Sequence, residues 1–268
     1  MKITLARTAG LVAVFLGLCS GPAQAQQSTE ELAKAVQNPI ASLISVPIQS
    51  NNDFDWGPKG EWLSVNNVQP VIPFSLNDDW DVVTRTILPI ISQPGTSSGQ
   101  GRETGLGDTL FTAFLVPKDS GSWIWGVGPA IQLPTASDSR LGKDEWAAGV
   151  SAVALTMPGK WVIGGLVSNV WGIGTDAGND INLFTFQPFI NYNLDGGWYL
   201  VSAPILTRDK EAASGQQWTV PIGGGFGRVF RIGSQPVNAQ TQLFYNIEKP
   251  DIAGVWGLRF QLQFMFPR

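Results

Sequence analysis

Large apolar side chains recur at every second position along most of this chain, most clearly near the C-terminus. Between Trp256 and Phe266 the apolar positions alternate with Gly257, Arg259, Gln261, Gln263 and Met265. A period of two places the two sets on opposite faces of a strand. A strand of this length with one aromatic-rich face fits the lipid-facing wall of an outer-membrane β-barrel, whose inner face can be wet.

The same alternation predicts twelve strands, joined in turn by tight turns and longer polar loops. The strands cover 40–50, 62–76, 80–92, 105–117, 122–134, 146–157, 160–171, 181–194, 197–207, 217–230, 236–247 and 254–266. The loops cover 51–61, 93–104, 135–145, 172–180, 208–216 and, more briefly, 248–253. An even strand number with short turns at one end and long loops at the other is typical of bacterial barrels. We therefore predict an all-β fold, a transmembrane antiparallel up-and-down β-barrel over residues 40–268 preceded by a short helix.

A soluble β fold is the alternative. A repeat of about 40 residues also suits a β-propeller blade. A blade packs four short strands into that length, whereas this chain fills it with two long ones. The strand lengths favour the barrel over a propeller or a soluble sandwich.

Tryptophans recur near the predicted strand ends. One group follows the short turns: Trp80, Trp123, Trp161 and Trp198. A second group lies beside the loops: Trp62, Trp146, Trp171, Trp218 and Trp256. Two rings of this kind predict aromatic girdles at the two membrane interfaces.

The N-terminal residues have the pattern of an export signal. Lys2 and Arg7 flank the start of a short apolar run, which ends at the small-residue site Ala23-Gln24-Ala25. We predict a signal peptide over 1–25, export by the Sec route and cleavage after Ala25. Ser28 and Glu31 then form a capping box that predicts a helix to about residue 38, within an N-terminal segment 26–39. This helix either plugs the lumen or lies in the periplasm, and the sequence leaves both open.

Composition excludes several functions. The chain has 17 Lys and Arg against 21 Asp and Glu, so nucleic acid is not an expected partner. It has no His, and its single cysteine, Cys19, lies inside the predicted signal peptide. The mature chain therefore lacks a histidine-based triad, a thiol nucleophile and the usual zinc ligands. We predict no enzymatic activity, no cofactor and no metal site. The stretch from Asn51 to Gly57 resembles a calcium loop only faintly, because its glycine and its twelfth position do not fit.

Polar side chains on the inward face are the candidate site. The segments 236–247 and 254–266 point one set of them to one side: Asn238, Gln240, Gln242, Asn246, Arg259, Gln261 and Gln263. Arg85 and Asp108 are added from two earlier strands. These residues either line a polar lumen that contacts solute or fill the barrel and bond to one another.

Phenylalanines raise a similar choice. They are Phe111, Phe184, Phe186, Phe226 and Phe230. They could form an apolar route for an aromatic solute, but facing lipid is the favoured interpretation.

Seven prolines interrupt the predicted strands: Pro70, Pro73, Pro89, Pro129, Pro188, Pro204 and Pro221. Proline removes a ladder hydrogen bond and normally marks a sheet edge, which a closed barrel lacks. We predict bulges at these positions.

Several stretches resemble one bacterial family. They are QNPIASLISVPIQSNNDFDWGPKG (37–60), QPVIPFSLNDDWDVVTRTILPI (69–90), GLGDTLFTAFLVPKD (105–119), GPAIQLPTASDSRLGKDEWAAG (128–149), QPFINYNL (187–194) and FRIGSQPVNAQTQLFYNIEKP (230–250). The family is that of the phenol-degradation MetA-pathway proteins, also misleadingly called "neuromedin U" or transporter. The resemblance implies an outer-membrane barrel linked to small hydrophobic or aromatic compounds, with no residue roles to carry over.

Together these observations predict an outer-membrane channel or transporter for small hydrophobic or aromatic solutes. The alternative is a closed barrel with a structural or surface-interaction role through its loops. The expected partners are outer-membrane lipid and lipopolysaccharide, the barrel assembly machinery and a small-molecule solute.

Overall fold

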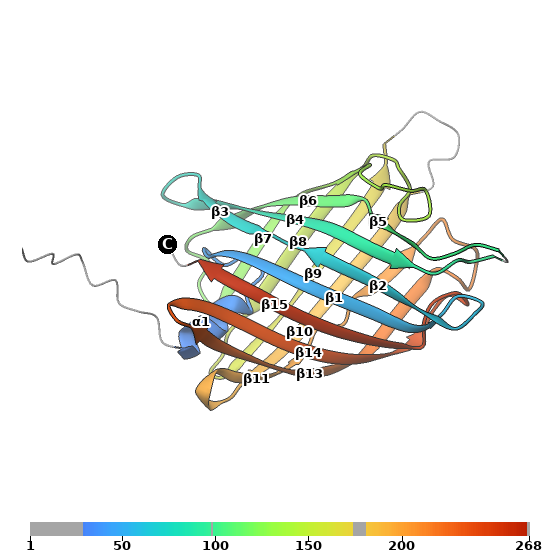
Figure 1. The fold of residues 1–268 in the computed structure, drawn as a ribbon. Helices are drawn as coiled ribbons and strands as arrows, with labels where there is room; N and C mark the ends of the chain where they lie inside the picture. The colour runs from blue at the N-terminus through green and yellow to red at the C-terminus, as the bar shows by residue number, and fades with distance from the viewer. Residues whose placement is uncertain (1–28, 98, 174–180, 267–268) are drawn as a thin grey trace, which may run out of the picture.

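The computed structural model describes residues 29–97, 99–173 and 181–266, which form one α-helix and one antiparallel sheet closed on itself (Figure 1). The helix is α1 (Thr29–Val36). The strands are β1 (Ile44–Trp56), β2 (Glu61–Val68), β3 (Val71–Ser75), β4 (Trp80–Gln93), β5 (Glu103–Leu106), β6 (Thr109–Pro117), β7 (Trp123–Leu133), β8 (Ala147–Thr156), β9 (Trp161–Gly172), β10 (Asn182–Asn193), β11 (Trp198–Ser202), β12 (Leu206–Asp209), β13 (Trp218–Ile232), β14 (Gln235–Glu248) and β15 (Trp256–Phe266). A short 3₁₀ turn, η1 (Asp195–Gly197), precedes β11.

The fifteen strands form a twelve-stranded barrel, because three of the twelve barrel strands are each interrupted once. β2 continues as β3, β5 as β6 and β11 as β12, and every barrel strand pairs with its sequence neighbours. The first and last strands close the barrel, with β1 and β15 paired from Ile44↔Phe266 to Phe54↔Trp256. The predicted 12-stranded antiparallel barrel is therefore confirmed.

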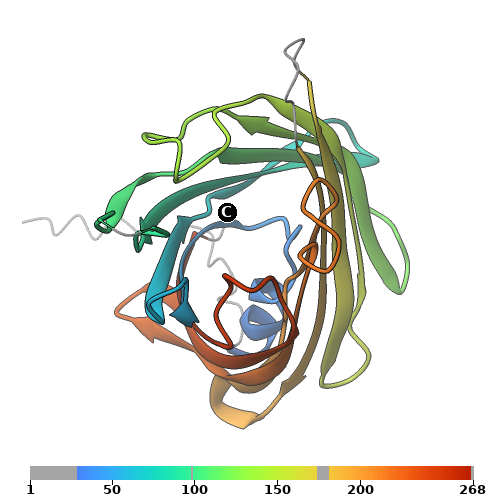
Figure 2. The same ribbon diagram turned by 90° about the vertical axis from the view of Figure 1, so that its right-hand side faces the viewer.

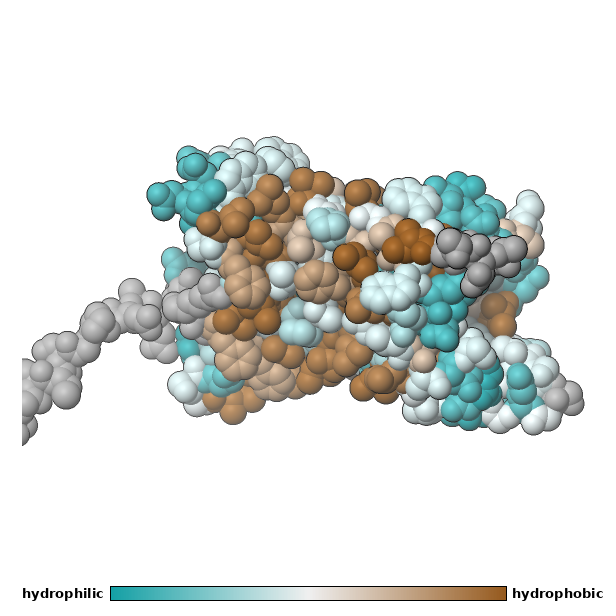
Figure 3. Space-filling model, turned by 90° about the horizontal axis from the view of Figure 1, so that it is seen from above, coloured by the Kyte–Doolittle hydropathy of each residue, from teal (hydrophilic) through white to brown (hydrophobic). Residues whose placement is uncertain are grey.

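The alternation seen in the sequence separates the two faces of the wall. On β15, Trp256 and Phe260 are 45% and 49% exposed, whereas Arg259 and Gln263 are buried inside. The exposed apolar side chains form a belt between two hydrophilic ends (Figure 3). The five phenylalanines considered for a route occupy outward positions of β6, β10 and β13. These positions support the lipid-facing interpretation for them.

The in-strand prolines gather in two parts of the wall. Pro188 of β10 faces the interruption at Pro204, and the register of β13 shifts beside them at Pro221. In the other part, Pro70 separates β2 from β3, and the Pro89 carbonyl accepts a hydrogen bond from Gly107 N at 2.9 Å. Pro73 and Pro129 instead lie in regular register with Val83 and Val150, so the predicted bulges are wrong there. The barrel thus accommodates most of its prolines at register shifts and strand breaks.

The first predicted loop, 51–61, is wrong. β1 runs to Trp56 and β2 begins at Glu61, so a turn of residues 57–60 joins them. Asn51 is polar because it faces the lumen, where its Oδ1 accepts a hydrogen bond from Arg259 Nε at 2.8 Å. A polar run inside a barrel wall therefore imitates a loop in sequence. The residues of the faint calcium motif lie mostly in this strand, and no acidic or sulfur cluster suited to a metal occurs among the described residues.

α1 lies inside the barrel at the end that carries the short turns, here called the turn end (Figures 1 and 2). Leu32 and Ala33 are each 1% exposed and belong to one apolar cluster with inner-wall side chains such as Val162. Within the described residues, no helix has the length and apolar character needed to cross a membrane. The predicted signal peptide, its cleavage site and the Ser28 cap lie outside the described residues.

Candidate lumen site

The inner wall has two chemically distinct arcs. The amide arc comprises the inward side chains of β14, β15 and β1, chiefly Asn238, Gln240, Gln242, Gln261, Gln263 and Gln49. The apolar arc comprises those of β7, β8 and β9, which include Gly126, Ala130, Ala147, Val153, Leu155, Val162, Leu166 and Val170. Their outer faces are equally apolar, so only the inner positions distinguish them.

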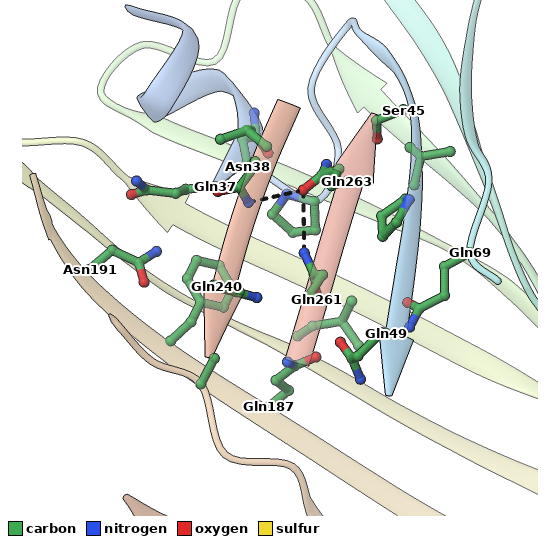
Figure 4. A pocket seen from close by; sticks show the side chains of 18 of the residues that line it. Gln37, Asn38, Ser45, Gln49, Gln69, Gln187, Asn191, Gln240, Gln261 and Gln263 are labelled. Carbon is green, nitrogen blue, oxygen red and sulfur yellow. Dashed lines mark hydrogen bonds between the residues drawn. The ribbon is translucent and has the colours of Figure 1, made fainter. Parts of the chain in front are cut away.

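A cavity of about 140 Å³ lies between the amide arc and the N-terminal segment. In Figure 4, Gln49, Gln240, Gln261 and Gln263 surround one space together with side chains from other parts of the chain. Those others are Gln37, Asn38, Ser45, Gln69, Gln187 and Asn191. The cavity is therefore lined largely by neutral amides.

Hydrogen bonds hold part of the amide arc in place. Gln263 Oε1 accepts from Asn238 Nδ2 at 3.4 Å and from Gln261 Nε2 at 3.3 Å. The Tyr199 hydroxyl donates to Asn238 Oδ1 at 2.7 Å, and a Cβ on Gly227 would overlap its ring. Tyr199 is 1% exposed, so its position is fixed by packing and by this bond.

Arg85 contributes the positive charge of the cavity. Its Nη2 donates to Gln69 Oε1 at 2.6 Å. No Asp or Glu lines the cavity, and no ion pair of Arg85 occurs among the described residues. Amides and one uncompensated cation therefore set the electrostatics of this space.

The N-terminal segment closes the cavity on the side of the turn end. Gln37 Nε2 donates to Asn193 Oδ1 at 2.8 Å, and Asn193 Nδ2 returns a bond to Gln37 Oε1 at 3.4 Å. Leu32 and Val36 of the segment belong to one apolar cluster with Val162 of the inner wall. The segment is thus joined to the wall by a reciprocal amide pair and by apolar contact.

Four predicted lumen residues lie outside the cavity. Arg259 Nη1 donates to the Ala203 carbonyl at 2.7 Å, and Gln242 Oε1 accepts from Ala203 N at 2.9 Å. These two side chains satisfy the backbone exposed where β11 breaks from β12. Asn246 is bonded locally, through Nδ2 to the Gly254 carbonyl at 2.7 Å.

Asp108 anchors a connection instead of lining the cavity. Its carboxylate accepts hydrogen bonds from Ala136 N at 3.2 Å and Lys143 N at 2.7 Å. In the same connection Arg140 binds both Asp138 and Glu103. The hydrogen bond from the Arg140 side chain lowers the pKa of the Asp138 carboxyl below its usual value, and the same bond raises the pKa of Arg140.

Of the predicted lumen residues, the structure brings Arg85, Asn238, Gln240, Gln261 and Gln263 together around the cavity. The sequence interpretation missed Gln37, Asn38, Ser45, Gln49, Gln69, Gln187, Asn191 and Tyr199. A signal was present for four of them, because Gln187 and Asn191 alternate with apolar residues along β10, and Ser45 and Gln49 do so along β1. The others come from segments whose proximity only barrel closure creates.

The tryptophans lie at both ends of the wall. Trp80, Trp123, Trp161 and Trp198 each begin a strand after a turn. Trp218 and Trp256 begin strands at the opposite end, where Trp146 and Trp171 flank β8 and close β9. Trp123, Trp146 and Trp161 are 54%, 50% and 43% exposed, so these rings are available to an interface.

An apolar outer belt, terminal tryptophans and a polar lumen define the class as an outer-membrane β-barrel with a partly filled lumen. The family model described as "Putative MetA-pathway of phenol degradation" matches residues 52–264. The chain belongs to this family.

One solved structure shows the same fold, and two others align with lower scores. An outer membrane channel from Pseudomonas putida F1 aligns with a TM-score of 0.64 and 18% identity, over 84% of this chain and 96% of that one. A monoaromatic hydrocarbon channel, CymD, aligns with a TM-score of 0.48 and 9% identity, over 90% and 91%. The outer membrane phospholipase of Salmonella typhi aligns with a TM-score of 0.41 and 12% identity, over 87% and 97%. Among curated proteins, none matches the sequence.

Proposed function

We propose that this protein is an outer-membrane channel for small hydrophobic or aromatic solutes. The observation that carries the proposal is the cavity of about 140 Å³ inside the barrel, where a merely structural wall would be packed. Membership of a family described by phenol degradation supports the solute class. The Pseudomonas putida F1 barrel of the same fold is itself described as an outer membrane channel.

We further propose that the segment 26–39 acts as a plug. Its support is the Gln37–Asn193 amide pair and the burial of Leu32 and Ala33 against the wall. In this arrangement the turn end faces the periplasm, after removal of a signal peptide by cleavage behind Ala25. Lipid and lipopolysaccharide contact the outer belt, and the barrel assembly machinery inserts the chain. The channel is not an enzyme, because the mature chain offers no histidine or cysteine for catalysis.

Conductance of the refolded mature protein in planar bilayers tests both proposals. We expect small or brief channels from the intact chain and larger, steady ones after deletion of residues 26–39. A second variant keeps the segment but replaces Leu32 and Val36 by Ser, which weakens the apolar contact of the segment without shortening it. Its conductance should resemble that of the deletion variant.

Flux of labelled aromatic compounds completes the test. Equal conductance of the intact and deleted proteins would overturn the plug. Absence of both conductance and flux in all three proteins would overturn the channel and favour a closed barrel that acts through its loops.

A further inference from the structure

The cavity carries an unbalanced charge. Arg85 has five N–H donors, and among the described residues they meet one acceptor, Gln69 Oε1 at 2.6 Å. The residues that line the cavity include no Asp or Glu. A cation held away from bulk water without a counter-ion is costly, so an anionic group entering this space gains binding energy.

A second lining residue also lacks a partner. Asn191 is 4% exposed, and its Oδ1 is buried without a hydrogen bond among the described residues. An unpaired buried acceptor favours a ligand that brings a donor, such as a hydroxyl. The cavity therefore offers one cationic donor group and one free acceptor.

Size and apolar lining limit the body of the ligand. The volume of about 140 Å³ is close to that of an apolar cavity of about 150 Å³ that binds benzene. Val71, Leu166 and Phe189 line the same space and give a ring apolar contact. One six-membered ring fits this volume, and its polar substituents would extend toward Arg85 and Asn191, which line the same space.

We propose that the cavity is a binding site for single-ring aromatic acids that carry a hydroxyl group, with Arg85 as the carboxylate anchor. This inference rests on the proposed channel function and names its solute class. The carboxylate of such a compound is ionised at neutral pH and can pair with the guanidinium. The hydroxyl can donate to Asn191, and unsubstituted hydrocarbons leave both groups unsatisfied.

Calorimetric titration of the refolded full mature chain with 4-hydroxybenzoate tests the site, with toluene and benzylamine as comparison probes. We expect the acid to bind more tightly than either probe. Arg85→Gln should weaken its binding by roughly tenfold to hundredfold, because a charge-assisted bond is lost. Arg85→Lys should recover part of the affinity, and Asn191→Leu should weaken hydroxybenzoate more than benzoate.

Arg228→Gln is the matched control. Arg228 lies over Trp198, at 5.1 Å from its ring centroid, and does not line the cavity. The Arg228→Gln substitution removes the same charge from the chain but at a distance from the cavity, so the affinity for 4-hydroxybenzoate should stay within about twofold. A gel-mobility test for the folded barrel accompanies each variant, and Arg85→Lys keeps the test valid if Arg85→Gln does not fold.

The outcomes separate the two proposals. Equal binding of toluene and 4-hydroxybenzoate, no binding of the acid, or no effect of Arg85→Gln in folded protein would overturn the inference. Aromatic flux measured in the same sample would then leave the channel function standing. Arg85-dependent binding without flux would instead retain the site and reject the channel.

Discussion

The two arcs of the inner wall have the same backbone architecture, but their inward side chains have opposite chemistry. The apolar arc of β7, β8 and β9 has mostly small or aliphatic inward residues, and several of them join the N-terminal segment in one apolar cluster. The amide arc of β14, β15 and β1 faces the cavity and is held by side-chain hydrogen bonds. One arc thus closes the lumen by packing, and the other keeps it able to bind solute.

This difference teaches which inner positions tolerate change. In the apolar arc most side chains are buried against other apolar side chains, and a charged group would have no counter-ion there. In the amide arc each side chain has a hydrogen-bonding alternative in its neighbour or in the solute. Substitutions in the apolar arc should therefore affect stability, whereas those in the amide arc should affect selectivity first.

The largest effect is expected for Leu155→Asp in the apolar arc. Leu155 is fully buried, and a carboxylate there would lack a partner. We expect the free energy of unfolding to fall by roughly 3 kcal/mol or more, as measured by denaturant unfolding in lipid. Leu155→Met conserves volume and should cost less than about 1.5 kcal/mol. Equal stability of the Asp variant and the wild type would show that this arc is not packed.

A smaller loss is expected for Gly227→Val, beside the amide arc. The added side chain would overlap the Tyr199 ring, which holds Asn238. We expect a loss of about 1–3 kcal/mol from overpacking, measured in the same unfolding assay. The loss should shrink in the double variant with Tyr199→Ala, whereas Gly101→Ala, which meets no atom within 4 Å, should be neutral. Additive effects of the two substitutions would contradict the contact.

Gln263→Leu tests the amide arc directly. It removes the acceptor of Asn238 Nδ2 and Gln261 Nε2, so a loss of about 1–2 kcal/mol is expected. Because it leaves the charge of the cavity unchanged, it should leave the reversal potential across a salt gradient close to that of the wild type. Gln263→Glu keeps acceptor oxygens but adds negative charge to the cavity of Arg85, so it should shift selectivity toward cations. If both variants had the same reversal potential, the amide arc would not influence ion permeation.

The smallest effect is expected in the connection between β7 and β8. The pKa of the Asp138 carboxyl is lowered by Arg140 in the folded protein. The ionised carboxylate therefore stabilises this connection fully at pH values above the unfolded pKa of 3.8, and this stabilisation is lost as the pH falls through the lower folded pKa. The protection of backbone amides in this connection against hydrogen exchange, relative to the intrinsic rate at each pH, should fall at low pH in the wild type. Asp138→Asn should remove that pH dependence, and a persisting pH step would assign it to another group.

Much of this fold follows from the sequence, because alternation is strong wherever a polar inner face meets an apolar outer face. β15 shows it best and supplied four of the predicted lumen or girdle residues, Trp256, Arg259, Gln261 and Gln263. β8 and β9 are small or apolar on both faces, so their ranges could be predicted but not their inner chemistry. Disruptions at Pro70 and Pro204 were predicted, but as bulges and not as complete strand breaks, because distant groups satisfy the backbone there.

The cavity depends on contacts between distant segments, which the local pattern of polar and apolar residues does not predict. Arg85 was recognisable as inward, but Gln69 becomes its partner only because β2 and β4 are neighbours. Asn191 comes from β10, and Gln37 comes from the N-terminal segment. The sequence therefore predicted the amides of two adjacent strands and not the space that they enclose with the rest of the chain.

The seam between β1 and β15 also sets the time at which this protein can fold. Its register pairs run from Ile44↔Phe266 to Phe54↔Trp256, so β1 cannot complete its pairing until β15 is available. Contacts between such distant segments raise contact order and slow folding, since the entropy of closing the whole chain is lost before the seam contributes. The other strands can form hairpins early, but β1 and β15 each keep one unpaired edge until the barrel closes. We therefore expect closure of this seam to be the slow kinetic step, and the closed barrel to persist long after formation.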